Sequence, residues 1–210
     1  MDNRKRVQFI NSLSGFKSAN MIGTSSRKNN DNLAIISSVV HLGTNPPLLG
    51  FILRPHSVDR HTLDNIKDTG VYTVNQVHAG IYKAAHQTSA RYARELSEFE
   101  ETGLTAERYD GFHAPFVSES KLSMGVKLVE VATITHNDTE FVIGEIQWVR
   151  TEESAIQDDG LVDLEALDTV AVSGLDRYHK SSALARLSYA KPDQEVREIP
   201  LAGLSDDEKD

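Results

Sequence analysis

Two pairs of apolar runs rich in β-branched residues constrain the fold of this chain more than any other feature of its sequence. The first pair, Leu33–Leu42 and Leu48–Leu53, is joined by the short segment Gly43–Pro47, which contains two prolines. Proline has no amide hydrogen and cannot continue a central strand, so this segment predicts a turn. β-branched residues favour strands, and two such runs with a short connection predict an antiparallel hairpin.

A second hairpin is predicted by the runs Val126–Thr135 and Phe141–Val149, which flank a polar turn. A further strand, Val71–Val77, alternates around Tyr72 and Val74. Alternation of this kind is typical of a strand with one buried face. The chain is therefore predicted to be mainly β.

Three helices are predicted between these strands. The first, Asp59–Thr69, is followed by Gly70, a residue typical of helix ends. The segment Ile81–Ala93 is rich in alanine, and Asp163–Leu167 predicts a short third helix. Because the helices fall between consecutive hairpins rather than alternating with single strands, an antiparallel barrel or sandwich is favoured over a doubly wound parallel sheet.

The composition and the missing motifs exclude several kinds of site. The 210 residues contain no cysteine, which excludes thiolate nucleophiles, iron–sulfur clusters and zinc ribbons. The net charge of -9 argues against a broad nucleic-acid-binding surface. The sequence has no HExxH, GxSxG, GxxxxGK[ST] or GxGxxG motif. We therefore predict no metal site, and neither a serine hydrolase elbow, a P-loop nor a Rossmann fingerprint.

The chain is predicted to be a single domain over residues 1–204, because no long linker divides it. Residues 205–210 are acidic and predict a solvated tail. No segment approaches the roughly 18 apolar residues of a membrane helix, and the first residues lack the apolar core of a secretory signal peptide. We expect a cytoplasmic protein with no membrane partner.

A cluster of cationic and hydroxyl side chains lies between the first hairpin and the first predicted helix. Its members are Arg54, Ser57, Arg60, His61 and Thr62. Guanidinium and hydroxyl donors beside the free amides of a helix start suit a phosphate monoester. An alternative is about equally supported: the two arginines pair with Asp59 and Asp64 on the surface, and Ser57 or Asp59 caps the helix.

Ser37 and Ser38 interrupt an otherwise apolar strand. A buried hydroxyl is costly without a hydrogen-bond partner. The edge of a flat heteroaromatic ligand is one such partner, whereas a bond to a nearby carbonyl is the more frequent outcome. Asn32, at the start of this strand, either meets the same ligand edge or closes a turn. His86 and Gln87 share one side of a helical segment with Lys83, a pattern usual for a solvated face.

Together these segments resemble the flavin reductase-like family of the FMN-binding split-barrel superfamily. The resemblance runs in order from about Ser18 to Thr151. Each segment alone is weak evidence, but their joint order is hard to obtain by chance. The segments are NLAIISSVVHLGTNPPLLGFILRP, SVDRHTLDNIKDTGVYTVN, KAAHQTSARY with SEFEETGL, APFVSES and FVIGEI.

The resemblance implies a six-stranded antiparallel Greek-key barrel that forms a homodimer with FMN at the subunit interface. It implies that four residues border the flavin ring: Asn32, Ser37, Ser38 and Val39. It assigns the FMN phosphate to Arg54, Ser57, Arg60, His61 and Thr62. His86 and Gln87 resemble a stretch that approaches the flavin, from the same subunit or from its partner.

The segment from about residue 152 is a C-terminal extension that resembles an ending found in a subset of the family. Its residues Tyr178 and His179 either shape a nicotinamide pocket or pack on the barrel. The implied activity is hydride transfer from NADH or NADPH to flavin N5, with no obligatory protein acid or base. Two alternatives remain: an FMN-binding electron carrier without a nicotinamide site, and a split barrel that has lost its flavin. The sequence leaves open whether NADH or NADPH is preferred. It also leaves open which acceptor, an oxygenase among others, receives the electrons.

Overall fold

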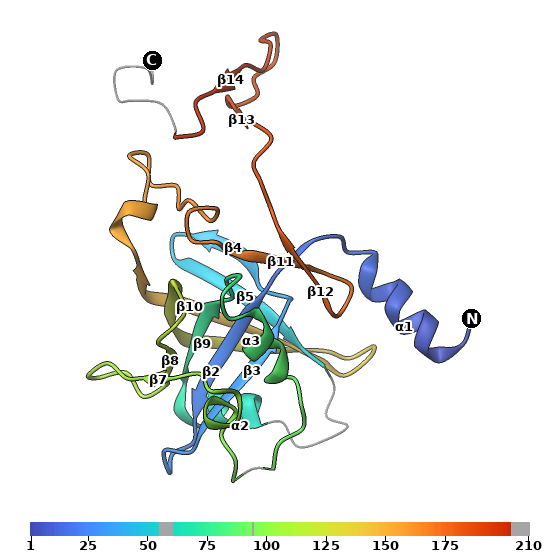
Figure 1. Ribbon diagram of the computed structural model, residues 1–210, viewed down its shortest axis with the longest axis vertical. Helices are drawn as coiled ribbons and strands as arrows, with labels where there is room; N and C mark the ends of the chain where they lie inside the picture. Colours follow the sequence, from blue (N-terminus) through green and yellow to red (C-terminus); the bar gives the residue numbers. More distant parts are fainter. Residues whose placement is uncertain (55–60, 94, 203–210) are drawn as a thin grey trace.

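An antiparallel sheet curled into a barrel forms the centre of the computed structural model, which describes residues 1–54, 61–93 and 95–202 (Figure 1). Within those residues the sheet has seven strands in the order β3-β2-β6-β9-β10-β5-β4. Their bounds are β2 (Asn20–Ser25), β3 (Asp31–Ile36), β4 (Val40–Thr44), β5 (Pro47–Leu53), β6 (Val71–Gln76), β9 (Leu122–Ile134) and β10 (Thr139–Thr151).

The short connection between β3 and β4 explains why the sheet curls. These two edge strands follow each other in sequence, and the link from Ile36 to Val40 spans at most about 14 Å. The edges of a flat seven-stranded sheet would lie roughly 29 Å apart. The sheet must therefore bend until the end of β3 comes close to the start of β4. The Ser38 hydroxyl then donates to the Ile52 carbonyl (3.1 Å) and accepts from the Ile52 amide (3.0 Å) on β5.

The mainly β antiparallel fold is thus confirmed, with one correction to its strands. The predicted single strand Leu33–Leu42 is divided between β3 and β4, which lie at opposite edges of the sheet. This division gives seven strands where the resemblance implied six. The turn is shorter than the predicted segment Gly43–Pro47, because Thr44 and Pro47 already pair with each other as strand residues.

The second predicted hairpin, β9–β10, is confirmed and is longer than its apolar runs. Its strands meet at a turn over residues 135–138, where Asp138 takes a left-handed conformation with φ of 55°. Gly144 of β10 faces the barrel interior. A Cβ atom there would lie 2.3 Å from the Tyr72 hydroxyl, so the close approach of these strands requires glycine.

The barrel interior is filled by aliphatic and aromatic side chains from both hairpins and from β2 and β6. Among them are Phe51 of β5 and Tyr72 of β6, whose rings meet edge to face at 5.5 Å. Helix α2 (His61–Thr69) closes one end with Leu63 and Ile66, both fully buried. As predicted, this helix ends at Gly70, whose φ is 73°. The predicted start at Asp59 lies outside the described residues.

A second core lies between the barrel and a small outer layer. This layer contains α3 (Tyr82–Gln87), α4 (Glu98–Thr102) and a sheet in the order β1-β11-β12, formed by Lys17–Ser18, Val170–Ser173 and Arg177–Lys180. The second core gathers Met21, Leu33, Val77, Phe99 and Val172 with other apolar residues. The outer layer therefore packs on β2 and β3.

Two predicted helices need correction. The helix expected over Ile81–Ala93 ends at Gln87, because the next residue, Thr88, turns its hydroxyl to the Ala85 carbonyl and to β3. The segment Asp163–Leu167 forms turns rather than a helix. There the Asp163 carboxylate accepts two backbone amides, and the left-handed Asp168 ends the segment.

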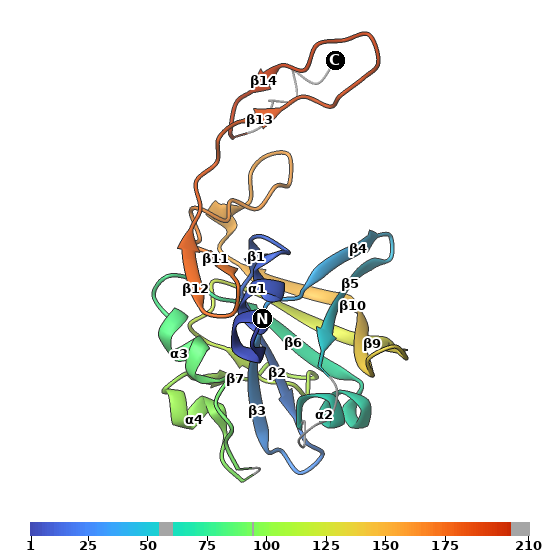
Figure 2. The same cartoon turned by 90° about the vertical axis from the view of Figure 1, so that its right-hand side faces the viewer.

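The two ends of the described chain lie outside the barrel. Helix α1 (Asn3–Ser12) buries none of its residues. Residues 181–202, which we call the C-terminal arm, extend away from the body (Figures 1 and 2). The remaining elements are β7 (Ala106–Glu107), β8 (Phe116–Val117), η1 (Glu153–Ala155), β13 (Arg186–Leu187) and β14 (Glu198–Ile199). Among the described helices, none has the length and apolar character needed to cross a membrane.

Candidate functional site

Asn32 and Thr62 lie together where β3 meets α2. The family resemblance had assigned Asn32 to the flavin ring and Thr62 to the phosphate. Asn32 is 7% exposed, and its amide donates to the hydroxyls of Thr62 (3.0 Å) and Thr24 (3.3 Å). Asn65 also donates to Thr24, at 3.1 Å. These four side chains form a buried polar network. In this structure Asn32 and Thr62 therefore bind protein groups and fix α2 against the barrel.

The link between β3 and β4 holds the three other residues expected beside a flavin ring. Both hydrogen bonds of the Ser38 hydroxyl go to Ile52, so this side chain closes the barrel. Val39 packs against the barrel core. Ser37 is half-buried, and within the described part of the chain its hydroxyl makes no hydrogen bond. Ser37 is thus the residue of this link with a donor to spare.

Arg54 follows β5 directly and is exposed. Its Nη2 atom donates to the Asn11 side chain of α1 at 3.1 Å. The backbone carbonyl of Asn11 also accepts a bond of 3.1 Å from Lys17. Burial lowers the pKa of Lys17, and the charge of Arg54 lowers it further. The structure therefore places a second cation beside the predicted phosphate residue.

The rest of the predicted phosphate cluster is only partly described. Ser57 and Arg60 lie outside the described residues, as does Asp59 of the alternative ion-pair interpretation. Within the part that the structure describes, Arg54 forms no ion pair, and the other expected partner, Asp64, is exposed. The hydroxyl of Thr62 is buried against Asn32.

The free edge of β3 is covered by two side chains instead of another strand. The Glu98 carboxylate accepts the Leu33 amide at 3.0 Å, and the Thr88 hydroxyl accepts the Ile35 amide at 2.9 Å. Burial raises the pKa of Glu98, while the hydrogen bond from Leu33 and the charge of His61 act in the opposite direction. His61, the first residue of α2, thus lies near enough to Glu98 for its charge to act on that carboxylate. The covered edge ends where the link at Ser37 begins.

His86 and Tyr178 meet although they are far apart in the sequence. A hydrogen bond of 2.9 Å joins His86 Nδ1 and the Tyr178 hydroxyl, and Tyr82 packs against the Tyr178 ring at 5.4 Å. Burial, and then the charge of Asp176, raise the pKa of Tyr178 to about 12. Gln87 donates instead to the Tyr92 hydroxyl at 3.1 Å. The pair His86–Tyr178 therefore ties α3 to β12.

Tyr178 and His179 do not lie on one surface. Neighbouring strand residues point to opposite faces, and His179 bonds to Ser173 at 2.8 Å and meets the Phe16 ring edge to face at 4.8 Å. Only Tyr178 faces α3. The two residues expected at a nicotinamide pocket thus belong to opposite faces of the small sheet.

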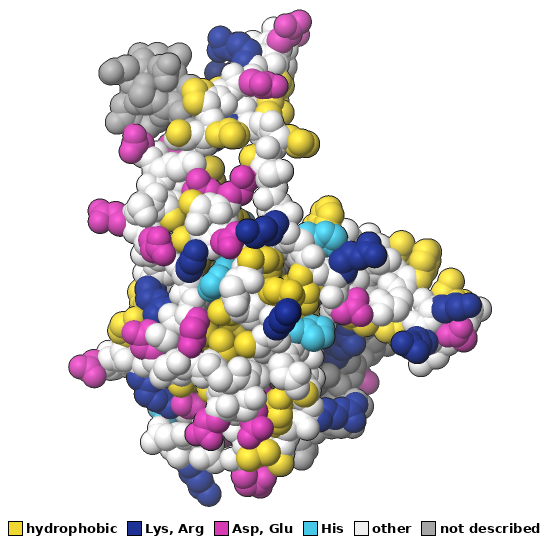
Figure 3. All heavy atoms as spheres, in the orientation of Figure 1, with side chains coloured by type: hydrophobic (Ala, Val, Ile, Leu, Met, Phe, Trp, Pro, Cys, Tyr) yellow, Lys and Arg dark blue, Asp and Glu magenta, His cyan; other side chains and the backbone are white. Residues whose placement is uncertain are grey.

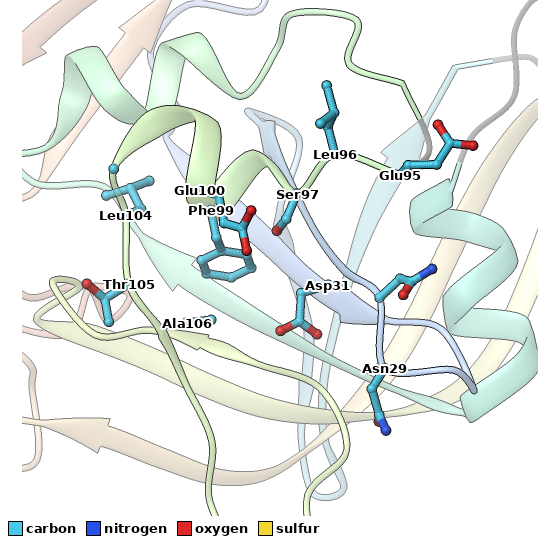
Figure 4. Close-up of a pocket in the computed structure, with 12 residues that line it drawn as sticks. Asn29, Asp31, Glu95, Leu96, Ser97, Phe99, Glu100, Leu104, Thr105 and Ala106 are labelled. Carbon is cyan, nitrogen blue, oxygen red and sulfur yellow. The ribbon is translucent and has the colours of Figure 1, made fainter.

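A cavity of about 530 Å³ lies on another side of the barrel, between the β2–β3 turn and α4 (Figure 4). Its lining includes three acidic residues, Asp31, Glu95 and Glu100. Asp31 is paired with Arg108. Because carboxylates repel a phosphate, this cavity is a poor site for a phosphorylated ligand. In the part that the structure describes, no group of three or more histidine, aspartate or glutamate side chains is placed to hold a metal ion.

Comparison with known proteins identifies a family for most of the chain. Residues 13–166 match the family described as flavin reductase like domain. A solved structure from Shewanella frigidimarina NCIMB 400, provisionally described as a flavin reductase with a split barrel domain, is 58% identical to this chain. It matches with a TM-score of 0.88 over 90% of this chain and 94% of its own. The fold is thus a split barrel.

More distant matches include a solved structure with the same fold and a relative found by sequence. Nitrilotriacetate monooxygenase component B from Bacillus cereus matches with a TM-score of 0.79 at 18% identity, over 89% of this chain and 95% of its own. An uncharacterized protein of Aquifex aeolicus (strain VF5) is 25% identical over 158 residues, which are 74% of this chain and 80% of that protein.

Proposed function

This chain belongs to the flavin reductase-like family, and on that premise we propose that it is an NAD(P)H-dependent flavin reductase that uses FMN. The observation that carries this proposal is the family match over residues 13–166 together with 58% identity to the Shewanella protein. The fit of the site residues to FMN supports it.

The residues at the barrel opening fit FMN in chemistry and in spacing. Ser38 is bonded to Ile52, and Arg54 stands two residues further along the chain, about 7 Å away at strand spacing. A ring beside the spare hydroxyl of Ser37 would therefore have a guanidinium within reach of its phosphate. Arg54 suits that role because it is exposed and, among the described residues, donates a hydrogen bond only to the neutral Asn11 side chain.

Hydride transfer to flavin requires no acid or base catalysis by this chain. When bound, FMN supplies the hydride acceptor, N5 of its ring. Arg54 would hold the phosphate, and Ser37 would donate to the ring edge. The His86–Tyr178 pair lies on an aromatic surface with Tyr82, and it suits packing against a nicotinamide. These residues bind and orient the two reactants, and we assign no catalytic residue.

The proposal includes a homodimer with the flavin at the subunit interface. Apolar side chains are exposed on α1, on the edge strand β4 and on the C-terminal arm, and Figure 3 shows hydrophobic and basic side chains side by side on α1. The hairpin β13–β14 pairs only two residues in each strand and has no core of its own, so it needs a surface to pack on. A second copy offers that surface. These exposed residues include Phe9 and Ile10 of α1, Leu13 directly after it, Val40 and Leu42 of β4, and Leu184, Leu187, Tyr189, Val196 and Leu201 of the C-terminal arm.

Reduction by a nicotinamide tests the function. The purified protein is titrated with FMN, and oxidation of NADH and of NADPH is then followed with and without protein at the same flavin concentration. We expect oxidation well above the rate with free flavin. Tight FMN binding without faster oxidation of either nicotinamide would contradict the reductase and favour an electron carrier. A preparation that takes up no FMN would contradict both.

A further inference from the structure

The edge of β3 that faces away from β2 is held by two side chains of the outer layer. The Thr88 hydroxyl accepts the amide of Ile35 at 2.9 Å, and the Glu98 carboxylate accepts the amide of Leu33 at 3.0 Å. Successive amides of a strand point to opposite edges, so these two belong to one alternating series. Ser37 is the next residue of that series and the first residue of the link that is proposed to border the flavin ring. The held edge therefore leads directly into the proposed flavin site.

Thr88 is a fixed acceptor. Its hydroxyl donates to the Ala85 carbonyl at 2.8 Å, and the residue is 4% exposed. Because the hydroxyl hydrogen is engaged by Ala85, the oxygen lone pairs are left for the Ile35 amide. A shift of β3 against α3 would leave a buried polar group without its partner, which is unfavourable. Thr88 thus couples the position of β3 to that of α3.

A second fixed point lies further back along β3. Glu98 is the first residue of α4 and is 8% exposed. A buried carboxylate is costly unless it is hydrogen-bonded, so its bond to Leu33 holds the side chain as well as the strand. Leu33 lies four residues before Ser37, whereas Ile35 lies two residues before it. The stronger constraint on the link is therefore expected at Thr88.

The segment that ends at Thr88 also reaches the aromatic surface proposed for the nicotinamide. His86, two residues before Thr88, shares a hydrogen bond of 2.9 Å with the Tyr178 hydroxyl, and Tyr82 of α3 packs on the Tyr178 ring. The end of α3 thus contacts both the surface for the hydride donor and the strand that leads to the hydride acceptor. Hydride transfer needs the reacting atoms about 3–3.5 Å apart, and a misplacement of about 1 Å can slow a reaction about 100-fold.

We propose that Thr88 is a positioning residue for hydride transfer, which sets the distance between flavin and nicotinamide through its bond to Ile35. Thr88 is buried at the edge of β3 and acts through the strand, and Glu98 is the second support of the same edge. This inference rests on the proposed function, and it identifies the side chains that hold the Ser37–Val39 link in place.

The test removes the acceptor at Thr88 and then restores it. Thr88→Val keeps the shape of the side chain without its hydroxyl, and Thr88→Ser keeps the hydroxyl. Thr69→Val is the matched control, because the Thr69 hydroxyl donates to the Asn65 carbonyl at 2.7 Å within α2. The dissociation constant of FMN is measured by fluorescence titration, and flavin reduction at saturating NADH or NADPH by stopped-flow absorbance.

We expect Thr88→Val to weaken FMN binding at least about threefold and to slow flavin reduction at least about tenfold, because the link is no longer held in one position. Thr88→Ser and Thr69→Val should change both quantities by less than about twofold. In the flavin-free protein, amide hydrogen exchange of residues 35–39 should quicken in Thr88→Val and stay unchanged in Thr69→Val.

A second pair of variants keeps the test informative if Thr88→Val does not fold. Glu98→Leu removes the acceptor of the Leu33 amide and should slow flavin reduction about threefold, whereas Glu98→Gln keeps an acceptor and should not. Unchanged FMN binding and reduction in the variants that lack an acceptor, or an equal loss in Thr69→Val, would overturn the inference even if the unaltered protein reduces flavin. An unaltered protein that binds FMN but is reduced by neither nicotinamide would overturn the proposed function, and this inference with it.

Discussion

The barrel and the segment after Thr151 obtain their structure in different ways. The barrel fills its own interior, where side chains such as Phe51 and Val142 are fully buried. The later segment, residues 152–202, buries few apolar side chains, and its Leu184 and Tyr189 are 102% and 88% exposed. The barrel is therefore stable by its own packing, whereas the C-terminal segment depends on contacts with other surfaces.

The C-terminal segment itself divides into two parts. Residues 170–180 are fastened to the body, because β11 pairs with β1 and Tyr178 bonds to His86. The C-terminal arm has a few polar attachments at its base, among them an ion pair between Arg186 and Asp159. The first part is thus held on the body of the protein, whereas the arm extends away from it (Figures 1 and 2).

The largest expected effect contrasts the two regions directly. Phe51→Ala removes a fully buried ring that packs on Tyr72, and should lower the free energy of unfolding by about 3–5 kcal/mol. Tyr189→Ala in the arm should change it by less than about 0.5 kcal/mol in dilute protein. Urea unfolding followed by circular dichroism measures both. Similar losses in the two variants would remove the distinction between the regions.

A smaller loss is expected where two barrel strands approach closely. In Gly144→Ala the new methyl group meets the Tyr72 hydroxyl and the Val126 side chain inside a filled core. Overpacking of this kind costs about 1–3 kcal/mol. Gly160→Ala, at a position with open space but a φ of 86°, is the comparison, since only its backbone is strained. If Gly144→Ala unfolds at the same urea concentration as the unaltered protein, the barrel core accommodates the extra methyl group without strain.

A smaller loss of stability is expected when the contact between the barrel and the C-terminal segment is weakened. Tyr178→Phe removes the hydrogen bond to His86 but keeps the ring on Tyr82, so unfolding should become easier by about 0.5–1.5 kcal/mol. Amide hydrogen exchange should quicken in β12 and α3 and stay unchanged in β9 and β10. Faster exchange throughout the barrel would contradict a local role for this contact.

Glu98, which covers the edge of β3, should make the stability of the protein depend on pH. The pKa of Glu98 is raised in the folded protein above its ordinary value of 4.5, so the folded state binds this proton more tightly than the unfolded state. The corresponding stability is present below about pH 4.5 and is lost as the pH rises through the folded pKa. The difference in unfolding free energy between the natural protein and Glu98→Gln should therefore fall with rising pH. A difference that grows with pH would show that the hydrogen bond from Leu33 and the charge of His61 together outweigh burial.

The sequence predicted the two hairpins well because their alternation and turns are local properties. It missed the break at Ser37–Val39, since that break follows from closure of a sheet whose other strands come later in the chain. The helix predicted to Ala93 stops early for a similar reason, because Thr88 is engaged by Ile35 of β3. Local patterns thus specified the strands, and long-range closure specified their limits.

In the candidate site, too, the residue types are visible in the sequence and the contacts depend on the fold. Asn32, Thr62, His86 and Tyr178 were each notable by type and position, but their pairing joins residues 30 and 92 positions apart. Nothing local marks Lys17, which lies near Arg54 because both side chains donate to Asn11 of α1. Several of these residues were thus notable in the sequence, whereas Lys17 and the contacts between the residues required the fold.

The position of FMN in a crystal of the protein grown with excess flavin is the most direct test of the account. We expect the phosphate within hydrogen-bond distance of Arg54 and the ring beside the Ser37–Val39 link. A flavin bound elsewhere, or an opening filled by the protein's own side chains, would contradict the proposed site and the function built on it.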